Sequence, residues 1–321
     1  MPNELITASS RELATELTAY DEKMLSVFEY LGLPTNNILV KVDERRKVFK
    51  NIEDVLEPLS SETLETSTYI SKFLSAVSAG LFDAALNYLW DETVSQLRFR
   101  VSQYDIQYFF DLAVTSDKRT KLSTEDDLVK IDDSELIQGA KEIGLISDIG
   151  YRLLDNIKFM RNWASAAHPN QVELTGLQLI DWLETCIKEV ISLPLSNLTI
   201  QIGKLLRNIK TNTLDEAEAE TISNFFCELT SEKANSLCNG FFGIYCRIDT
   251  TSDTKRNIKL LLPKLWYLVD EDVKWNCGIK YSKFQINNDQ TEAKLAREFL
   301  QIVNAESYLP ESIRSAELKI E

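Results

Sequence analysis

Four side chains in one short segment have the types and the spacing that phosphodiester cleavage requires. The only histidine of the chain, His168, follows Arg161 by seven residues, so on an α-helix the two share a face about 10 Å apart, with Ser165 between them. Asn162 lies about 100° further round the same helix. A guanidinium holds a phosphate and stabilises its developing charge, an imidazole transfers a proton at neutral pH, and an amide positions the phosphate or the attacking hydroxyl. Arg161, Asn162 and His168 are therefore candidate catalytic residues for metal-independent phosphodiester cleavage.

The expected place of His168 at a helix end favours this chemistry. Pro169 disfavours the helical conformation of the preceding residue, so the imidazole is expected at the helix C-terminus, where the macrodipole stabilises its protonated form. The spacing also has a purely structural interpretation, because chance gives such a pair in roughly 15% of chains when Arg is about 5% of residues. In that interpretation His168 caps the last carbonyls and Arg161 is a solvated surface charge.

Basic side chains near this segment supply local positive charge. Lys158 and Arg152 precede Arg161 on the same predicted helix and are, together with Ser165, candidate RNA contacts. Lys158 and Arg152 can also each be interpreted as an isolated surface cation. The other basic residues that could add to such a patch are Arg98, Arg100, Lys118, Arg119 and Lys121.

The elements that must position these side chains are predicted to be helices. Apolar residues recur every three or four positions over 10–30, 43–56, 134–143, 148–168, 176–193, 196–209 and 290–304, with caps expected at Ser147 or Asp148 and at Thr175. The long apolar block 68–101 is either one helix or two helices joined near Gly80. The short apolar run 38–42 is a possible strand, and the polar stretch 115–135 is expected to be an exposed loop. The predicted fold class is all-α.

Composition limits the possible functions. The net charge of −15 and the pI near 4.7 make the whole molecule repel nucleic acid and anionic membranes, so any polyanion must meet a local basic patch. No window approaches the roughly 18 apolar residues of a membrane span, and the first residues lack a signal-peptide core, which predicts a cytoplasmic protein that does not bind membranes.

The sequence offers no metal or cofactor motif. Five cysteines without a Cys-x-x-Cys pair, beside one histidine, are interpreted as buried reduced thiols. Three acidic residues of the 68–101 block, Asp83, Asp91 and Glu92, are interpreted as a solvated helix face. We therefore expect neither a metal ion nor a cofactor.

The pattern around the histidine resembles the HEPN family. The hallmark of that family is an Arg, four to six residues, then a His, with a polar residue, often Asn, directly after the Arg; these features fall on Arg161, Asn162 and His168 with a gap of six. The resemblance covers roughly residues 65–195, with the block 68–101 in the place of an early HEPN helix. It implies an α-helical bundle that commonly homodimerises, so that two copies of the motif form one metal-independent endoribonuclease site. Such a site uses the 2′-hydroxyl of RNA and leaves a cyclic phosphate.

The resemblance also suggests a biological role and a division of the chain. Many HEPN proteins act in bacterial defence, as toxins or abortive-infection effectors that attack RNA. We expect an N-terminal helical region over 1–64, a HEPN-like bundle over 65–195, and a helical C-terminal region over 196–321 that senses a trigger or binds a regulatory protein partner. The alternative hypothesis is a non-catalytic helical module for dimerisation and protein interaction, which the acidic surface favours.

Overall fold

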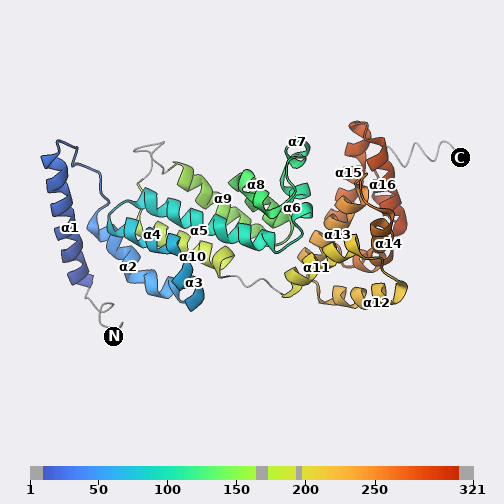
Figure 1. Ribbon diagram of the computed structural model, residues 1–321, viewed down its shortest axis with the longest axis horizontal. Helices are drawn as coiled ribbons and strands as arrows, with labels where there is room; N and C mark the ends of the chain where they lie inside the picture. Colours follow the sequence, from blue (N-terminus) through green and yellow to red (C-terminus); the bar gives the residue numbers. More distant parts are fainter. Residues whose placement is uncertain (1–9, 164–172, 193–196, 311–321) are drawn as a thin grey trace. The chain divides into compact units, whose positions relative to one another are not determined.

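The computed structural model describes residues 10–163, 173–192 and 197–310. Within these three ranges every regular element is a helix, which confirms the predicted all-α class (Figure 1). The apolar run 38–42 is not a strand, because the described residues contain no second extended segment to pair with it, and it leads instead into a helix. No helix in these ranges has the length and apolar character needed to cross a membrane.

The chain divides into two compact units, and each unit is built from two separate segments. The first unit comprises Met1–Phe99 and Ile146–Pro194, and the second comprises Arg100–Leu145 and Leu195–Glu321. The expected boundary near 195 coincides with one limit of these units, but residues 100–145 group with the C-terminal region instead of with the expected bundle over 65–195. The physical reason is packing: the helix Ile106–Ala113 is buried against the helix Ser231–Cys246, and the Tyr108 hydroxyl donates to the carbonyl of Ser236 at 3.1 Å.

The first unit is formed by helices that begin where the sequence offers a cap. Ser67 accepts from the backbone N–H of Ile70, and Thr175 forms a capping box with Gln178. Helix α10 packs against α2 and α9, and α1 packs against α2. The elements of this unit are α1 (Ser10–Tyr30), α2 (Val42–Leu56), α3 (Ser61–Thr66), α4 (Thr68–Ser78), most of α5 (Phe82–Ser102), α9 (Asp148–Trp163), α10 (Gly176–Cys186) and the π-helical turn η2 (Ile187–Ile191).

A buried arginine fixes the junction between α4 and α5. Gly80 ends α4 with a φ of 73°, which separates the two helices and settles the choice left open by the sequence. The Arg45 side chain is fully buried beside this glycine; it donates to both carboxylate oxygens of Asp21 at 2.7 and 2.8 Å, and to the carbonyls of Val40 and Ser78. A Cβ atom at position 80 would lie 2.6 Å from the guanidinium, so only glycine fits there.

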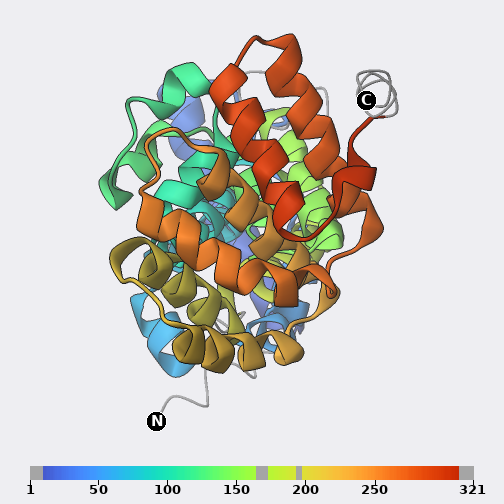
Figure 2. The same ribbon diagram turned by 90° about the vertical axis from the view of Figure 1, so that its right-hand side faces the viewer.

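The second unit has an aromatic core. The Phe299 ring meets the rings of Phe242, Tyr245 and Trp266 edge-on, with centroids 5.1, 5.7 and 6.5 Å away. Helices α15 and α16 lie side by side against α13 (Figure 2). The elements are α6 (Ile106–Ala113), α7 (Ser116–Arg119), the 3-10 turn η1 (Glu125–Lys130), α8 (Asp133–Glu142), α11 (Asn197–Thr211), α12 (Glu216–Asn224), the 3-10 turn η3 (Phe225–Glu228), α13 (Ser231–Cys246), α14 (Ser252–Trp266), α15 (Glu271–Ile286), α16 (Gln290–Ile302) and the 3-10 turn η4 (Glu306–Tyr308).

The polar stretch 115–135 is more ordered than an exposed loop. It contains α7 and η1, and it buries Leu122, Leu128 and Ile131. The Asp127 carboxylate holds the turn together by accepting from the backbone N–H groups of Ser123 and Thr124. The expectation of a plain loop was wrong because three spaced apolar residues anchor an otherwise charged stretch.

Candidate functional site

The candidate site lies on the last described turn of α9. The Ser147 hydroxyl accepts from the backbone N–H of Gly150 and caps this helix, as predicted. Leu154 and Ile157 are buried and define the face of α9 that packs into the unit. Arg161 follows Leu154 by two helical turns, so it projects from the packed side of the helix and is half-buried.

Arg161 is oriented by an asparagine from α5. Its Nε donates to the Asn87 Oδ1 atom at 2.9 Å, and its Nη1 donates to the Oδ1 atom of Asn162 at 3.1 Å. The amide group of Asn87 is itself fixed, because its Nδ2 donates to the carbonyl of Asp83 one turn earlier, also at 2.9 Å. The backbone of α5 thus orients Asn87, which in turn orients the guanidinium.

The remaining predicted residues of this segment have different environments. Lys158 forms an ion pair with Asp155 at 2.8 Å. Arg152 is exposed, with its guanidinium carbon 5.6 Å from the centre of the Tyr151 ring. His168 and Ser165 lie outside the described residues. The structure therefore brings together Arg161 and Asn162 and adds Asn87.

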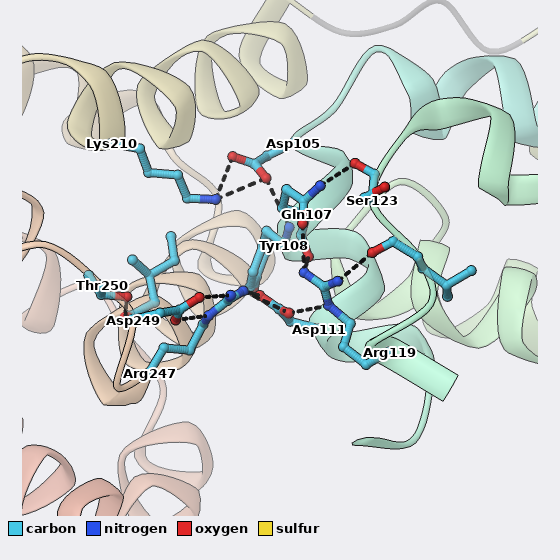
Figure 3. Close-up of polar contacts among 12 residues, drawn as sticks. Asp105, Gln107, Tyr108, Asp111, Arg119, Ser123, Lys210, Arg247, Asp249 and Thr250 are labelled. Carbon is cyan, nitrogen blue, oxygen red and sulfur yellow. Dashed lines mark hydrogen bonds and ion pairs between the residues drawn. The ribbon is translucent and has the colours of Figure 1, made fainter. Parts of the chain in front are cut away.

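Two of the basic residues considered for a wider positive patch are held in ion pairs. Arg119 donates from Nε to Asp111 at 2.5 Å and from Nη2 to the Gln107 side chain at 2.7 Å (Figure 3). Lys118 pairs with Glu135. These two cations belong to the scaffold of the second unit, because neighbouring carboxylates neutralise their charges.

One carboxylate of α5 is buried, contrary to the expectation of a solvated face. Glu92 is 3% exposed; its Oε2 accepts from the Ser67 hydroxyl at 2.7 Å and its Oε1 accepts from the Gln96 amide at 2.9 Å. Asp83 and Asp91 are half-buried. Glu92 joins the start of α4 to α5, since the same Ser67 hydroxyl caps α4.

All five cysteines are free thiols, and four of them are buried. Burial raises the pKa of the Cys186 thiol to about 12. Cys227 is exposed, which corrects the expectation that all five lie in the core. Within the described residues, no group of three or more His, Cys, Asp or Glu side chains is placed to hold a metal ion.

Comparison with family models, with curated proteins and with solved structures finds no match to this chain.

Asn87 was missed by the sequence interpretation, and no local signal points to it, because it lies 74 residues before Arg161.

Proposed function

We propose that this chain is a HEPN-like, metal-independent endoribonuclease that cleaves RNA by attack of the 2′-hydroxyl on the adjacent phosphate, and that it acts as a defence or toxin effector. The observation that carries the proposal is the fixed guanidinium of Arg161. A half-buried cation held by Asn87 and Asn162 is oriented before substrate arrives. Pre-oriented charge of this kind stabilises the developing charge of a transition state at little reorganisation cost.

The three motif residues take distinct roles in this reaction. Arg161 binds the scissile phosphate and stabilises the pentacoordinate intermediate. His168 removes the proton of the 2′-hydroxyl or delivers a proton to the departing 5′-oxygen. Asn162 positions the phosphate. Arg161 donates to the amide oxygens of Asn87 and Asn162, and these two bonds help to fix the direction of the guanidinium.

The chain is proposed to form a homodimer through α9. Four large apolar side chains of α9 are exposed on one side of the helix, spread over about 120° of its circumference. They are Ile149, Leu153, Phe159 and Trp163, which are 72, 41, 53 and 38% exposed. The rings of Phe159 and Trp163 also contact each other, with centroids 5.7 Å apart. Pairing of this face with its equivalent would bury this apolar surface between two copies; Arg161 lies about 140° round α9 from the centre of this face.

The experiment compares RNA cleavage in EDTA by the wild type and by Arg161→Ala, Arg161→Lys and His168→Ala. Cleavage should leave a 2′,3′-cyclic phosphate and a 5′-hydroxyl. All three variants should lose it, since Lys lacks the planar fork of Arg. The matched control is Lys188→Ala, which removes an exposed cation from the same unit. Intact RNA with the wild type under every trigger tried, or unchanged cleavage by His168→Ala, would overturn the proposal.

The second candidate is a non-catalytic helical interaction module, which the exposed apolar surface of α15 favours. Trp275, Ile279 and Ile286 are 45, 47 and 82% exposed, while Cys277 and Tyr281 on the same helix are buried. Sedimentation of the wild type and of Ile279→Lys tests this candidate. The interaction module is supported if the wild type self-associates, the substitution abolishes this association, and the chain leaves RNA intact. It is rejected if the chain cleaves RNA.

A further inference from the structure

A pocket of about 530 Å³ lies within the second unit, between α6, α13, α15 and α16. Its volume is in the range of small-molecule sites, and its lining combines apolar and charged side chains as such sites do. Phe242, Phe284 and Ile248 supply apolar surface, and Asn239, Lys280 and Glu292 supply polar groups.

One wall of the pocket is a preformed ion cluster (Figure 3). Arg247 donates from Nη1 to both oxygens of Asp111 at 2.7 and 3.0 Å, and from Nε and Nη2 to Asp249 at 2.9 and 2.6 Å. The carboxylate of Asp249 and that of Asp111 raise the pKa of Arg247 well above its usual value. Asp111 accepts in addition from Arg119. These charges neutralise one another, so the cluster acts as a rigid wall and leaves ligand recognition to other residues.

Two opposite charges of the lining, Lys280 and Glu292, have no ionic partner among the residues that the structure describes. Lys280 on α15 donates to the Oδ1 atom of Asn239 at 3.2 Å, and its ammonium lies 5.4 Å from the centre of the Phe242 ring. Glu292 lies in the first turn of α16. Across the described residues neither Lys280 nor Glu292 forms an ion pair, although both line the same pocket and both are half-buried.

We infer that this pocket binds a free α-amino acid with an apolar side chain. The carboxylate of the ligand meets Lys280, its ammonium meets Glu292, and its side chain packs against Phe284 and Ile248. A ligand with a single charge would remove water from both protein charges and satisfy only one of them, which is costly. A zwitterion satisfies both. The inference is independent of RNA cleavage, because every residue that carries it belongs to the second unit.

Calorimetric titration of the full chain with L-phenylalanine and L-leucine tests the inference. Two analogues of phenylalanine each keep one charge: phenethylamine lacks the carboxylate, and 3-phenylpropionate lacks the ammonium. Each should bind the wild type at least about tenfold more weakly, because a charged hydrogen bond is lost. The inference would be overturned if neither amino acid bound at millimolar concentration. It would also be overturned if the two analogues bound as tightly as phenylalanine. This series needs no substitution, so it does not depend on the folding of any variant.

Substitutions then assign each charge to one end of the ligand. Lys280→Met should bind phenylalanine and phenethylamine equally, since the contact to the carboxylate is gone. Glu292→Gln should bind phenylalanine and 3-phenylpropionate equally. The matched controls are Lys283→Met and Asp272→Asn, which remove exposed charges of α15 outside the pocket and should bind like the wild type. A reversed pattern, or weakening by the controls as large as that by the pocket variants, would contradict the assignment.

Discussion

Substitution of Gly80 tests how strongly the first unit depends on its buried arginine. Gly32 is the natural control, because both glycines have a φ of 73° and both follow the end of a helix. At Gly32 a Cβ atom would have no heavy atom within 4 Å, whereas at Gly80 it would lie 2.6 to 2.8 Å from three atoms of the Arg45 guanidinium. The two positions therefore share the backbone strain of an alanine and differ in the steric conflict.

The expected costs follow from this difference. An alanine in the left-handed region costs about 1–2 kcal/mol, partly offset by the lower entropy of the unfolded chain, so Gly32→Ala should destabilise by about 1 kcal/mol. Gly80→Ala must also displace a fully buried guanidinium held by Asp21 and two carbonyls. Loss of one charged hydrogen bond adds about 1.5–3 kcal/mol, which gives a total of about 2.5–4 kcal/mol.

Urea unfolding of the full chain, followed by circular dichroism, measures both costs. The free energy of unfolding should fall about three times as much for Gly80→Ala as for Gly32→Ala. When Arg45 is already replaced by leucine, the further loss of unfolding free energy caused by Gly80→Ala should equal that of Gly32→Ala, because the guanidinium atoms that would clash with the alanine are gone. Equal costs of the two alanines in the wild-type background would refute the steric argument.

Three further predictions concern the site, the thiols and the dependence of stability on pH. If the chain cleaves RNA as proposed, Asn87→Ala should lower kcat about tenfold with little change in KM, because the guanidinium loses its acceptor on α5; an unchanged kcat would exclude the positioning role. Ellman's reagent should label one thiol rapidly in the folded chain, and Cys227→Ser should abolish that labelling, because the other four thiols are buried. The Lys47 side chain and the backbone N–H of Gly176 lower the pKa of Glu44 from its ordinary 4.5, so its contribution to stability is present above that pH and is lost as pH falls through the lowered pKa; Glu44→Gln should flatten this part of the acid-unfolding profile.

The sequence predicted helix positions well because their signals are local. The ends of α1, the start of α9 at Ser147 and the start of α10 at Thr175 depend on residues within one turn of the element. The break at Gly80 was also local, although only the structure shows that Arg45 demands it.

Features that depend on contacts between distant segments were not predictable in this way. Glu92 has the spacing of a surface residue, yet a serine 25 positions earlier satisfies it in the core. Asn87 and Arg161 meet only because α5 and α9 fold together. The charges of Lys280 and Glu292 look like ordinary exposed helix charges until α15 and α16 form one side of a pocket. Periodicity describes the face of a helix, whereas these contacts depend on which helix covers that face.

Because each unit is built from two separate segments, folding during synthesis must wait for the later segment. Helix α6 carries Tyr108, which is fully buried in the folded chain, and α13, whose Ser236 carbonyl accepts from the Tyr108 hydroxyl, ends only at Cys246. At about 5–20 residues per second, the ribosome needs on the order of ten seconds to make the intervening chain. During that interval Tyr108 lacks this partner, so the nascent protein should bind chaperones at α6. A chain truncated after position 194 never contains α13, so its α6 should remain exposed to chaperones.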